Sequence, residues 1–253
     1  MRVSALPFVC ALAAGCHRPP PEPPTDAGPP AVSSAKPLEW NSVPVEALPA
    51  AGELPPDTLR VLVLGDSVAK FLGNVMRFRQ STARAFVAQR GVGTCSIRPA
   101  DDGSSCATAW EGDVAELHPD VTFVILGGGF LGPQTCEREW RRSYHDRLRT
   151  LLREIAPNAG RIVLALVPYA SPRWRTTSNA ESVLCFDDEL ASVGSELGAS
   201  MLDLLHHVCP HGDVCNETSE GAPIRRDGLH FDGPGAHETA EWTLRELRRI
   251  AGR

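Results

Sequence analysis

Three residues of this chain could together carry out nucleophilic catalysis, namely Ser67, Asp227 and His230. Ser67 ends the turn Gly65-Asp66-Ser67, which directly follows the apolar, β-branched run Val61–Leu64. A serine hydroxyl becomes a nucleophile when a base lies within hydrogen-bond reach and a third group orients that base. In this pattern Ser67 would be the nucleophile and His230 the base. Asp227 would accept the Nδ1 proton of His230 and stabilise the imidazolium.

Simpler interpretations exist for the same residues. Ser67 could merely cap the helix that we expect over 68–79, and Asp227 could cap a helix beside a surface His230. The remaining histidines suit the role of base less well. His17 lies in the N-terminal segment and His118 at a strand start. Two others are expected inside helices, at His145 and His237, and three in a cysteine-rich loop, at His206, His207 and His211.

The elements that must position these residues alternate between strand and helix. Apolar runs predict strands at 61–64, 84–89, 120–126, 161–167 and 199–204. Helical spacing predicts helices at 68–79, 110–117, 136–155, 179–197 and 234–250. This alternation indicates a parallel sheet covered by helices on both faces. The turn at Ser67 and the loop at His230 then share the edge at which the strands end, where ligands bind.

The N-terminal segment is expected to lie outside the fold. The apolar run Val3–Ala14 is too short to span a bilayer and fits a signal peptide. It ends in Leu12-Ala13-Ala14-Gly15-Cys16, which resembles a bacterial lipobox, so we expect residues 1–16 to be a lipoprotein signal with lipidation of Cys16. An ordinary secretory signal is the alternative. Residues 17–56 are rich in proline and predict an extended tether to a domain over 57–253.

Net charge and cysteine content narrow the possibilities further. The formal charge of −6 gives no basic footprint, so nucleic acid is not an expected partner. Six of the eight cysteines lie in the folded domain, and an even number in an exported chain indicates disulfides. Proximity in sequence favours Cys95–Cys106 and Cys209–Cys215, which leaves Cys136–Cys185. A metal site at Cys209 and Cys215 is the alternative, but the spacing fits no standard zinc pattern.

The combination of Gly65-Asp66-Ser67 with Asp227-x-x-His230 resembles the SGNH (GDSL-type) hydrolases, over residues 59 to the C-terminus. The loop 205–215 and the run Ile224–Phe231 are most similar to periplasmic SGNH domains associated with acyltransferase-3 proteins. The resemblance implies a flavodoxin-like, three-layer α/β/α sandwich around five parallel strands. It also implies a triad of Ser67, His230 and Asp227, with no metal or organic cofactor.

The same resemblance implies an oxyanion hole built from N–H groups. One donor would be the Ser67 N–H, and a second would come from Gly91 or Gly93, of which we favour Gly93 because it directly precedes the cysteine loop. The family's usual third donor is an Asn side chain after the third strand, and this chain has glycines there instead. A backbone N–H of Gly128 or Gly129 would then substitute, or activity would be weak or lost.

We expect a serine esterase that is monomeric. We expect it to be a lipoprotein of the bacterial envelope, either periplasmic or at the surface. It would act on acyl esters, chiefly acetyl esters, of surface glycans. The alternatives are a glycan O-acyltransferase with the same triad and a non-catalytic, glycan-binding lipoprotein.

Two further pairs of residues have a functional and a structural interpretation. Trp110 and Trp174 could be sugar-binding walls or core residues, and Arg225 and Arg226 could meet an anionic glycan or form a solvated pair.

Overall fold

The computed structural model describes residues 54–93, 95, 97, 106–127, 136–174 and 180–253. All of them lie in the second of the two units into which the chain divides, Pro44–Arg253. The predicted signal peptide, Cys16 and most of the predicted tether therefore lie outside the described residues. So do Gly128 and Gly129, two of the predicted oxyanion donors.

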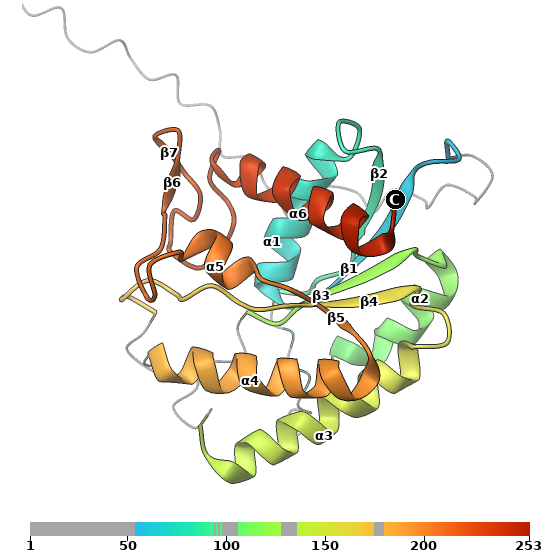
Figure 1. The fold of residues 1–253 in the computed structure, drawn as a ribbon, viewed down its shortest axis with the longest axis horizontal. Coiled ribbons are helices and arrows are strands. Elements are labelled where there is room, and N and C mark those ends of the chain that lie inside the picture. The colour runs from blue at the N-terminus through green and yellow to red at the C-terminus, as the bar shows by residue number, and fades with distance from the viewer. Residues whose placement is uncertain (1–53, 94, 96, 98–105, 128–135, 175–179) are drawn as a thin grey trace, which may run out of the picture. The chain divides into compact units, whose positions relative to one another are not determined.

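A five-stranded parallel sheet forms the centre of the domain (Figure 1). Its strands are β1 (Leu59–Gly65), β2 (Ala85–Gln89), β3 (Val121–Ile125), β4 (Arg161–Ala165) and β5 (Ser200–Leu202). They follow the order β2-β1-β3-β4-β5, and every neighbouring pair is parallel. Four consecutive residues of β1, Val61–Leu64, are almost completely buried, as a strand covered on both faces requires.

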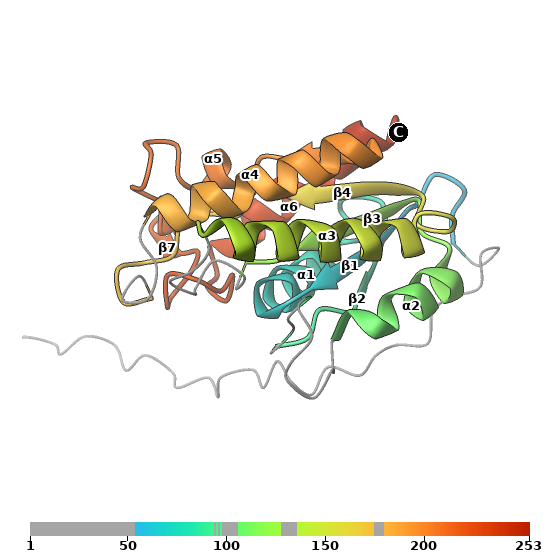
Figure 2. The same cartoon turned by 90° about the horizontal axis from the view of Figure 1, so that it is seen from below.

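Helices cover both faces of the sheet (Figures 1 and 2). One face carries α1 (Ser67–Arg79) and α6 (Ala236–Ala251), which contact each other. The other face carries α2 (Trp110–Leu117), α3 (Arg138–Ile155) and α4 (Ala180–Leu197). Helix α3 buries Tyr144, Leu148 and Leu152 at helical spacing and turns its charged residues outward. The predicted three-layer α/β/α sandwich is therefore confirmed.

The region after the fifth strand is more structured than the sequence predicts. The strand ends at Leu202 rather than 204, because the Asp203 side chain accepts the N–H of His206 (3.0 Å) and starts a short helix, α5 (Leu204–Val208). A small antiparallel hairpin of β6 (Thr218–Ser219) and β7 (Ala222–Pro223) follows. The sequence predicts a loop in this region, because α5, β6 and β7 are all too short to produce a periodic pattern of apolar residues.

Two of the three predicted disulfides are present in the described residues. Cys136–Cys185 links the segment before α3 to α4, and Cys209–Cys215 closes the loop after α5. Cys95 is also disulfide-bonded. Because the Cys106 side chain lies outside the described part, the pairing of Cys95 with Cys106 stays a prediction. Within the described ranges, no cluster of side chains suited to a metal ion occurs, and no helix is long and apolar enough to cross a membrane.

Candidate active site

Ser67 lies at a sharp turn between β1 and α1, and the turn depends on Gly65. The φ of Gly65 is +133°, and a Cβ at this position would lie 1.8 Å from the carbonyl oxygen of Ile125 on β3. Only glycine fits this approach. The next residue, Asp66, donates its N–H to the same Ile125 carbonyl (3.3 Å). The turn is thereby fixed to the end of the neighbouring strand.

Asp66, rather than Ser67, caps α1. The Asp66 carboxylate accepts the N–H of Val68 at 2.9 Å, and Ser67 is the first residue of the helix. The alternative interpretation of Ser67 as the helix cap is therefore wrong. Because the cap is supplied by its neighbour, the Ser67 hydroxyl can take part in a different hydrogen bond.

That hydrogen bond joins Ser67 to His230, 163 residues later in the chain. The Ser67 Oγ lies 2.8 Å from His230 Nε2, and His230 Nδ1 lies 2.7 Å from Asp227 Oδ2. The structure thus brings together the three residues that the sequence singled out. A hydroxyl, an imidazole and a carboxylate in this order have the geometry for removing the serine proton and stabilising the resulting imidazolium.

The carboxylate of Asp227 is held by the backbone that follows it. Its Oδ1 accepts the N–H groups of Leu229 (2.9 Å) and His230 (2.8 Å). Burial by itself raises the pKa of Asp227, but these bonds and the one from the His230 ring outweigh it, so the pKa lies below its usual value. Asp227 does not cap a helix, because α6 begins at Ala236 with Gly235 before it. That alternative is therefore wrong too.

A loop that sequence reasoning overlooked holds the Asp227–His230 segment in place. This loop is the exit loop of β4, residues 166–174. Its Ser171 N–H donates to the Gly228 carbonyl oxygen (2.8 Å), and its Trp174 indole N–H donates to the Asp227 carbonyl oxygen (2.8 Å). Gly228 has a φ of +72°, and a Cβ there would lie 2.1 Å from the Cβ of Ser171. No sequence pattern pairs these positions, which are more than 50 residues apart.

Two aromatic rings flank the His230 imidazole. The Phe71 ring of α1 lies 4.7 Å away, and the Trp174 ring lies 6.0 Å away in a perpendicular arrangement. Trp110, in contrast, is 2% exposed and belongs to the core. Of the two tryptophans that were candidate walls of a binding site, only Trp174 is therefore beside the triad.

The candidate oxyanion donors differ in their surroundings. The Ser67 N–H is among the first N–H groups of α1, which have no acceptor within the helix. Gly91 packs closely on the start of α1, where a Cβ would lie 2.6 Å from the Lys70 nitrogen, whereas a Cβ on Gly93 would meet open space. Gly127 also approaches α1, since its Cβ would lie 2.5 Å from Val68. The donor roles of Ser67 and Gly93 stay predictions, as do those of Gly128 and Gly129.

Several other candidate residues in the described part of the chain contact residues other than Ser67. His145 contacts Glu189 and Glu196, and His206 contacts Asp203. Arg226 is exposed, but Arg225 is buried. A solvated pair, one of the two interpretations of these arginines, is therefore wrong for Arg225, because its side chain is buried in an ion pair with Glu217.

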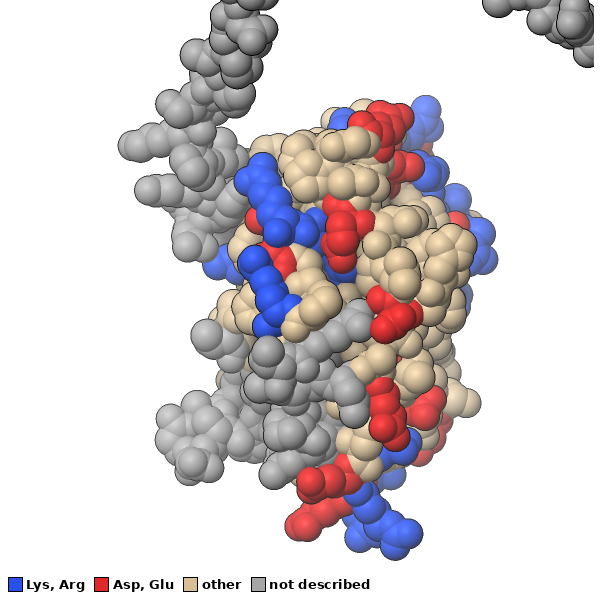
Figure 3. All heavy atoms as spheres, turned by 90° about the vertical axis from the view of Figure 1, so that its left-hand side faces the viewer, with Lys and Arg blue, Asp and Glu red and all other residues tan. Residues whose placement is uncertain are grey.

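The side of the molecule at which the strands end is shown in Figure 3. Basic and acidic side chains are interspersed over the described part of this face. The described part of this face therefore shows no large surface of a single charge that would select a highly charged ligand.

Comparison with known proteins gives a match by structure only. No protein-family model matches this chain, and no curated protein sequence matches it. Among solved structures, a GDSL-like lipase from Bacteroides thetaiotaomicron superposes with a TM-score of 0.58 at 14% identity. That match covers 81% of this chain and 92% of the lipase.

Two further solved structures have the same fold. A lipase/acylhydrolase from Enterococcus faecalis has a TM-score of 0.53 at 19% identity, covering 77% of this chain and 96% of that protein. An acetylxylan esterase from Geobacillus stearothermophilus has a TM-score of 0.51 at 15% identity, covering 77% of this chain and 94% of the esterase. The described domain thus shares the fold of GDSL-type lipases and acylhydrolases.

Proposed function

We propose that this chain is a serine esterase of the SGNH (GDSL-type) hydrolase family. The observation that carries the proposal is the continuous chain of hydrogen bonds from Ser67 through His230 to Asp227. It lies at the end of β1 in a fold shared with several lipases and acylhydrolases. The two tight glycine positions, Gly65 and Gly228, support it, because each allows a backbone path that places a triad residue.

In the proposed acylation step, Ser67 Oγ attacks the ester carbonyl carbon while its proton moves to His230 Nε2. The carbonyl oxygen becomes an oxyanion, which N–H groups near the start of α1 would stabilise. The bond from the carbonyl carbon to the alcohol oxygen then breaks, and the leaving alcohol takes the proton from His230. Asp227 stays ionised throughout, consistent with its lowered pKa.

In the proposed deacylation step, His230 removes a proton from water as the water oxygen attacks the acyl-enzyme. The bond to Ser67 Oγ breaks, the proton returns to that oxygen, and a carboxylic acid leaves. A sugar hydroxyl in place of water would make the same site an O-acyltransferase. Both reactions use one acyl-enzyme, so the triad geometry is common to them.

We further propose acyl esters of glycans, chiefly acetyl esters, as the substrate, and the bacterial envelope as the location. The lipobox-like sequence ending at Cys16 and the proline-rich segment after it support an anchored, exported protein. The half-buried indole of Trp174 beside His230 supports a sugar, since an aromatic ring offers an apolar face to the C–H groups of a pyranose. An acetylxylan esterase is among the solved structures of the same fold.

The test compares the wild type with Ser67→Ala on p-nitrophenyl acetate and on an acetylated oligosaccharide. We expect Ser67→Ala to lose the activity and to lose labelling by a fluorophosphonate. Ser192→Ala, an exposed serine of α4, should keep both. Equal hydrolysis by the wild type and Ser67→Ala would reject the esterase proposal.

A second candidate function, glycan binding without catalysis, is favoured by one observation. The chain has Gly127-Gly128-Gly129 where SGNH enzymes usually supply an Asn donor to the oxyanion hole, and losing one such donor costs roughly 3 kcal/mol of transition-state stabilisation. In this case the acetylated oligosaccharide would bind to the wild type, as measured by calorimetry, but would not be hydrolysed. Fluorophosphonate labelling of Ser67 would contradict it.

A further inference from the structure

Asp227 and His230 lie on a segment without regular secondary structure, between the end of β7 and the start of α6. Such a segment has no ladder of backbone hydrogen bonds to fix it, yet the distances within the triad require it to be fixed. The exit loop of β4 holds one side of it through Ser171 and Trp174. A second anchor is found two residues before Asp227, at Arg225.

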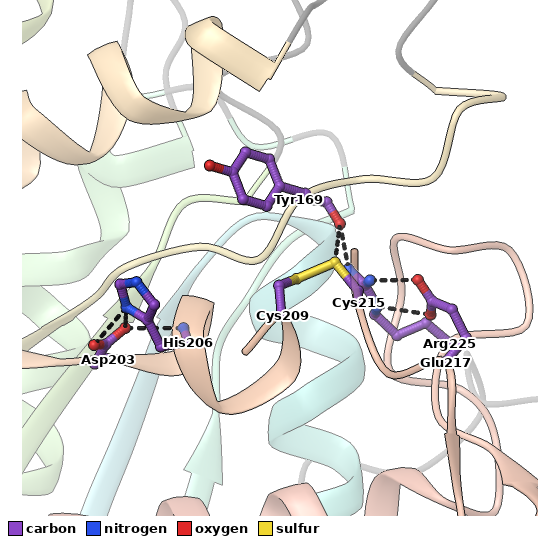
Figure 4. The surroundings of a disulfide bond; sticks show 7 residues. All are labelled: Tyr169, Asp203, His206, Cys209, Cys215, Glu217 and Arg225. Atoms are coloured by element: carbon purple, nitrogen blue, oxygen red, sulfur yellow. Dashed lines mark hydrogen bonds and ion pairs between the residues drawn. A yellow bond between two sulfur atoms is a disulfide. The ribbon is translucent and has the colours of Figure 1, made fainter. Parts of the chain in front are cut away.

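The side chain of Arg225 is 1% exposed and joins three parts of the chain. Its Nη2 donates to Glu217 Oε1 (2.6 Å) and its Nε donates to Glu217 Oε2 (3.2 Å), which makes a two-pronged ion pair. Its Nη1 donates to the carbonyl oxygen of Tyr169 in the β4 exit loop (2.8 Å). Figure 4 shows the guanidinium between these two partners.

The partner of Arg225 is itself held by a disulfide loop. Glu217 follows Cys215 by two residues, and the Cys209–Cys215 bond closes the loop (Figure 4). The neighbouring Asn216 donates its N–H to the Val208 carbonyl (2.7 Å), and Cys215 Sγ lies 3.6 Å from the Tyr169 carbonyl oxygen. The loop, the exit loop of β4 and the guanidinium therefore meet at one place.

The geometry points to Arg225 as a positioning residue for the triad, which transmits the rigidity of the Cys209–Cys215 loop to Asp227 and His230. The inference rests on the proposed esterase function. Arg225 acts through the backbone, because its carbonyl accepts the N–H of Gly228 (2.9 Å), and Gly228 separates Asp227 from Leu229.

The physical reason is the cost of burying an arginine charge. A guanidinium keeps its proton in proteins, so a buried one requires partners for its N–H groups. Removing one partner of a buried pair leaves an uncompensated charge, which is strongly unfavourable. The observed arrangement of the segment supplies both Glu217 and the Tyr169 carbonyl to Arg225, and in the same arrangement Asp227 lies against His230.

The test uses Arg225→Met, Arg225→Lys and Glu217→Gln in the full-length protein. We expect kcat for p-nitrophenyl acetate to fall on the order of 10²-fold in Arg225→Met, the cost of a displacement of ~1 Å, with little change in KM. Arg225→Lys should recover part of the loss, because lysine keeps the charge without the fork. Because Glu217 is 40% exposed, we expect Glu217→Gln to fold, and we expect its kcat also to be lower than that of the wild type.

Arg253→Gln is the matched control. Arg253 pairs with Asp120, which precedes β3, at the opposite edge of the sheet. This variant should keep the wild-type kcat even where its melting temperature falls. If folded Arg225→Met and Glu217→Gln both kept the wild-type kcat, the positioning role would be rejected.

A spectroscopic readout separates this inference from the proposed activity. The proton between His230 Nδ1 and Asp227 Oδ2 should give a low-field signal in the proton NMR spectrum of the wild type. We expect the signal to disappear in Arg225→Met and to remain in Arg253→Gln. If the signal changes in this way but the wild type has no esterase activity, the positioning role is supported and the proposed esterase function is rejected. Retention of the signal and of kcat in a folded Arg225→Met would reject the positioning role alone.

Discussion

Two aspartates at the site differ in what their carboxylates hold. Asp66 binds the N–H of Val68 and caps α1, which leaves the Ser67 hydroxyl to His230. Asp227 binds two N–H groups with one oxygen and the His230 ring with the other. Since both oxygens of Asp227 have partners, its position and its ionised form are stabilised together, and we expect the activity to depend on its charge.

Asp227→Asn tests that dependence. An amide in place of the carboxylate would stabilise the wrong tautomer of His230 and would not stabilise its charged form, so we expect kcat to fall by about 10⁴-fold. The measurement is p-nitrophenyl acetate hydrolysis by folded protein. Asp232→Asn is the control, because Asp232 accepts the Arg226 N–H (2.9 Å) outside the triad. A kcat for Asp227→Asn within tenfold of the wild type would contradict the assigned role.

Gly228→Ala tests the close approach of the β4 exit loop. The added Cβ would lie 2.1 Å from Ser171 Cβ, so the segment must move and the triad with it. We expect a large loss of kcat together with a lower melting temperature. Gly198→Ala is the control, since Gly198 also has positive φ (+67°) but its Cβ would meet nothing within 4 Å.

The control variant should lose about 1 kcal/mol of stability from backbone strain and should keep its activity. Equal activity losses in the two glycine variants would show that backbone strain, rather than the contact with Ser171, is responsible.

At the scale of elements, hydrogen bonds fix the exit loop of β4 near its start and at its far end. Its far end contacts Asp227 and Gly228 through Trp174 and Ser171. Near its start, the N–H of Val167 donates to Asp187 Oδ1 of α4 (3.1 Å). Burial raises the pKa of Asp187 to about 8, although the Val167 hydrogen bond opposes the shift. The helix therefore supports the loop with a carboxyl group that is protonated at neutral pH.

This protonation predicts a pH-dependent stability. In the unfolded chain Asp187 loses its proton near the ordinary aspartate pKa of 3.8, while the folded protein keeps it up to about pH 8. Between these values the folded state binds more protons. The free energy of unfolding should then decrease as pH rises from about 4 to 8, by up to about 1.4 kcal/mol per pH unit.

Asp187→Asn should remove most of this slope, because the amide oxygen can still accept the Val167 N–H but does not titrate. Melting temperatures of the wild type and the variant between pH 4 and 8 would measure it. Asp188→Asn, at the exposed neighbouring position, should retain most of the slope. If the wild type and Asp187→Asn had parallel profiles, the buried carboxyl would not be responsible.

At the scale of the whole molecule, the proposed location depends on the N-terminal residues. We expect Cys16→Ser to release the protein from the membrane fraction, because the thiol is the proposed site of lipidation. Cys10→Ser is the matched control, since Cys10 lies within the segment that we expect to be removed, and it should leave the protein in the membrane fraction. Fractionation of the expressed full-length chain is the measurement. An unchanged distribution for Cys16→Ser would contradict lipidation at this residue.

Much of the fold could be predicted from local patterns in the sequence. The run Val61–Leu64 reads as a doubly buried strand, and the spacing of Tyr144, Leu148 and Leu152 reads as a helix, because burial on one or two faces imposes a fixed periodicity. Short elements gave no such signal. Helix α5 begins at a capping aspartate and spans five residues, and the β6–β7 hairpin pairs two strands of two residues each, so a loop was the sequence-based expectation.

The candidate triad could be proposed from the sequence because its residues sit at recognisable points, a strand-to-helix turn and a segment before the last helix. The order β2-β1-β3-β4-β5, the meeting of Ser67 Oγ with His230 and the burial of Arg225 were decided only by the tertiary structure. The physical reason is that sequence periodicity reports which residues are buried, but not against what. Contacts between segments more than 50 residues apart depend on how the whole sheet and its loops pack.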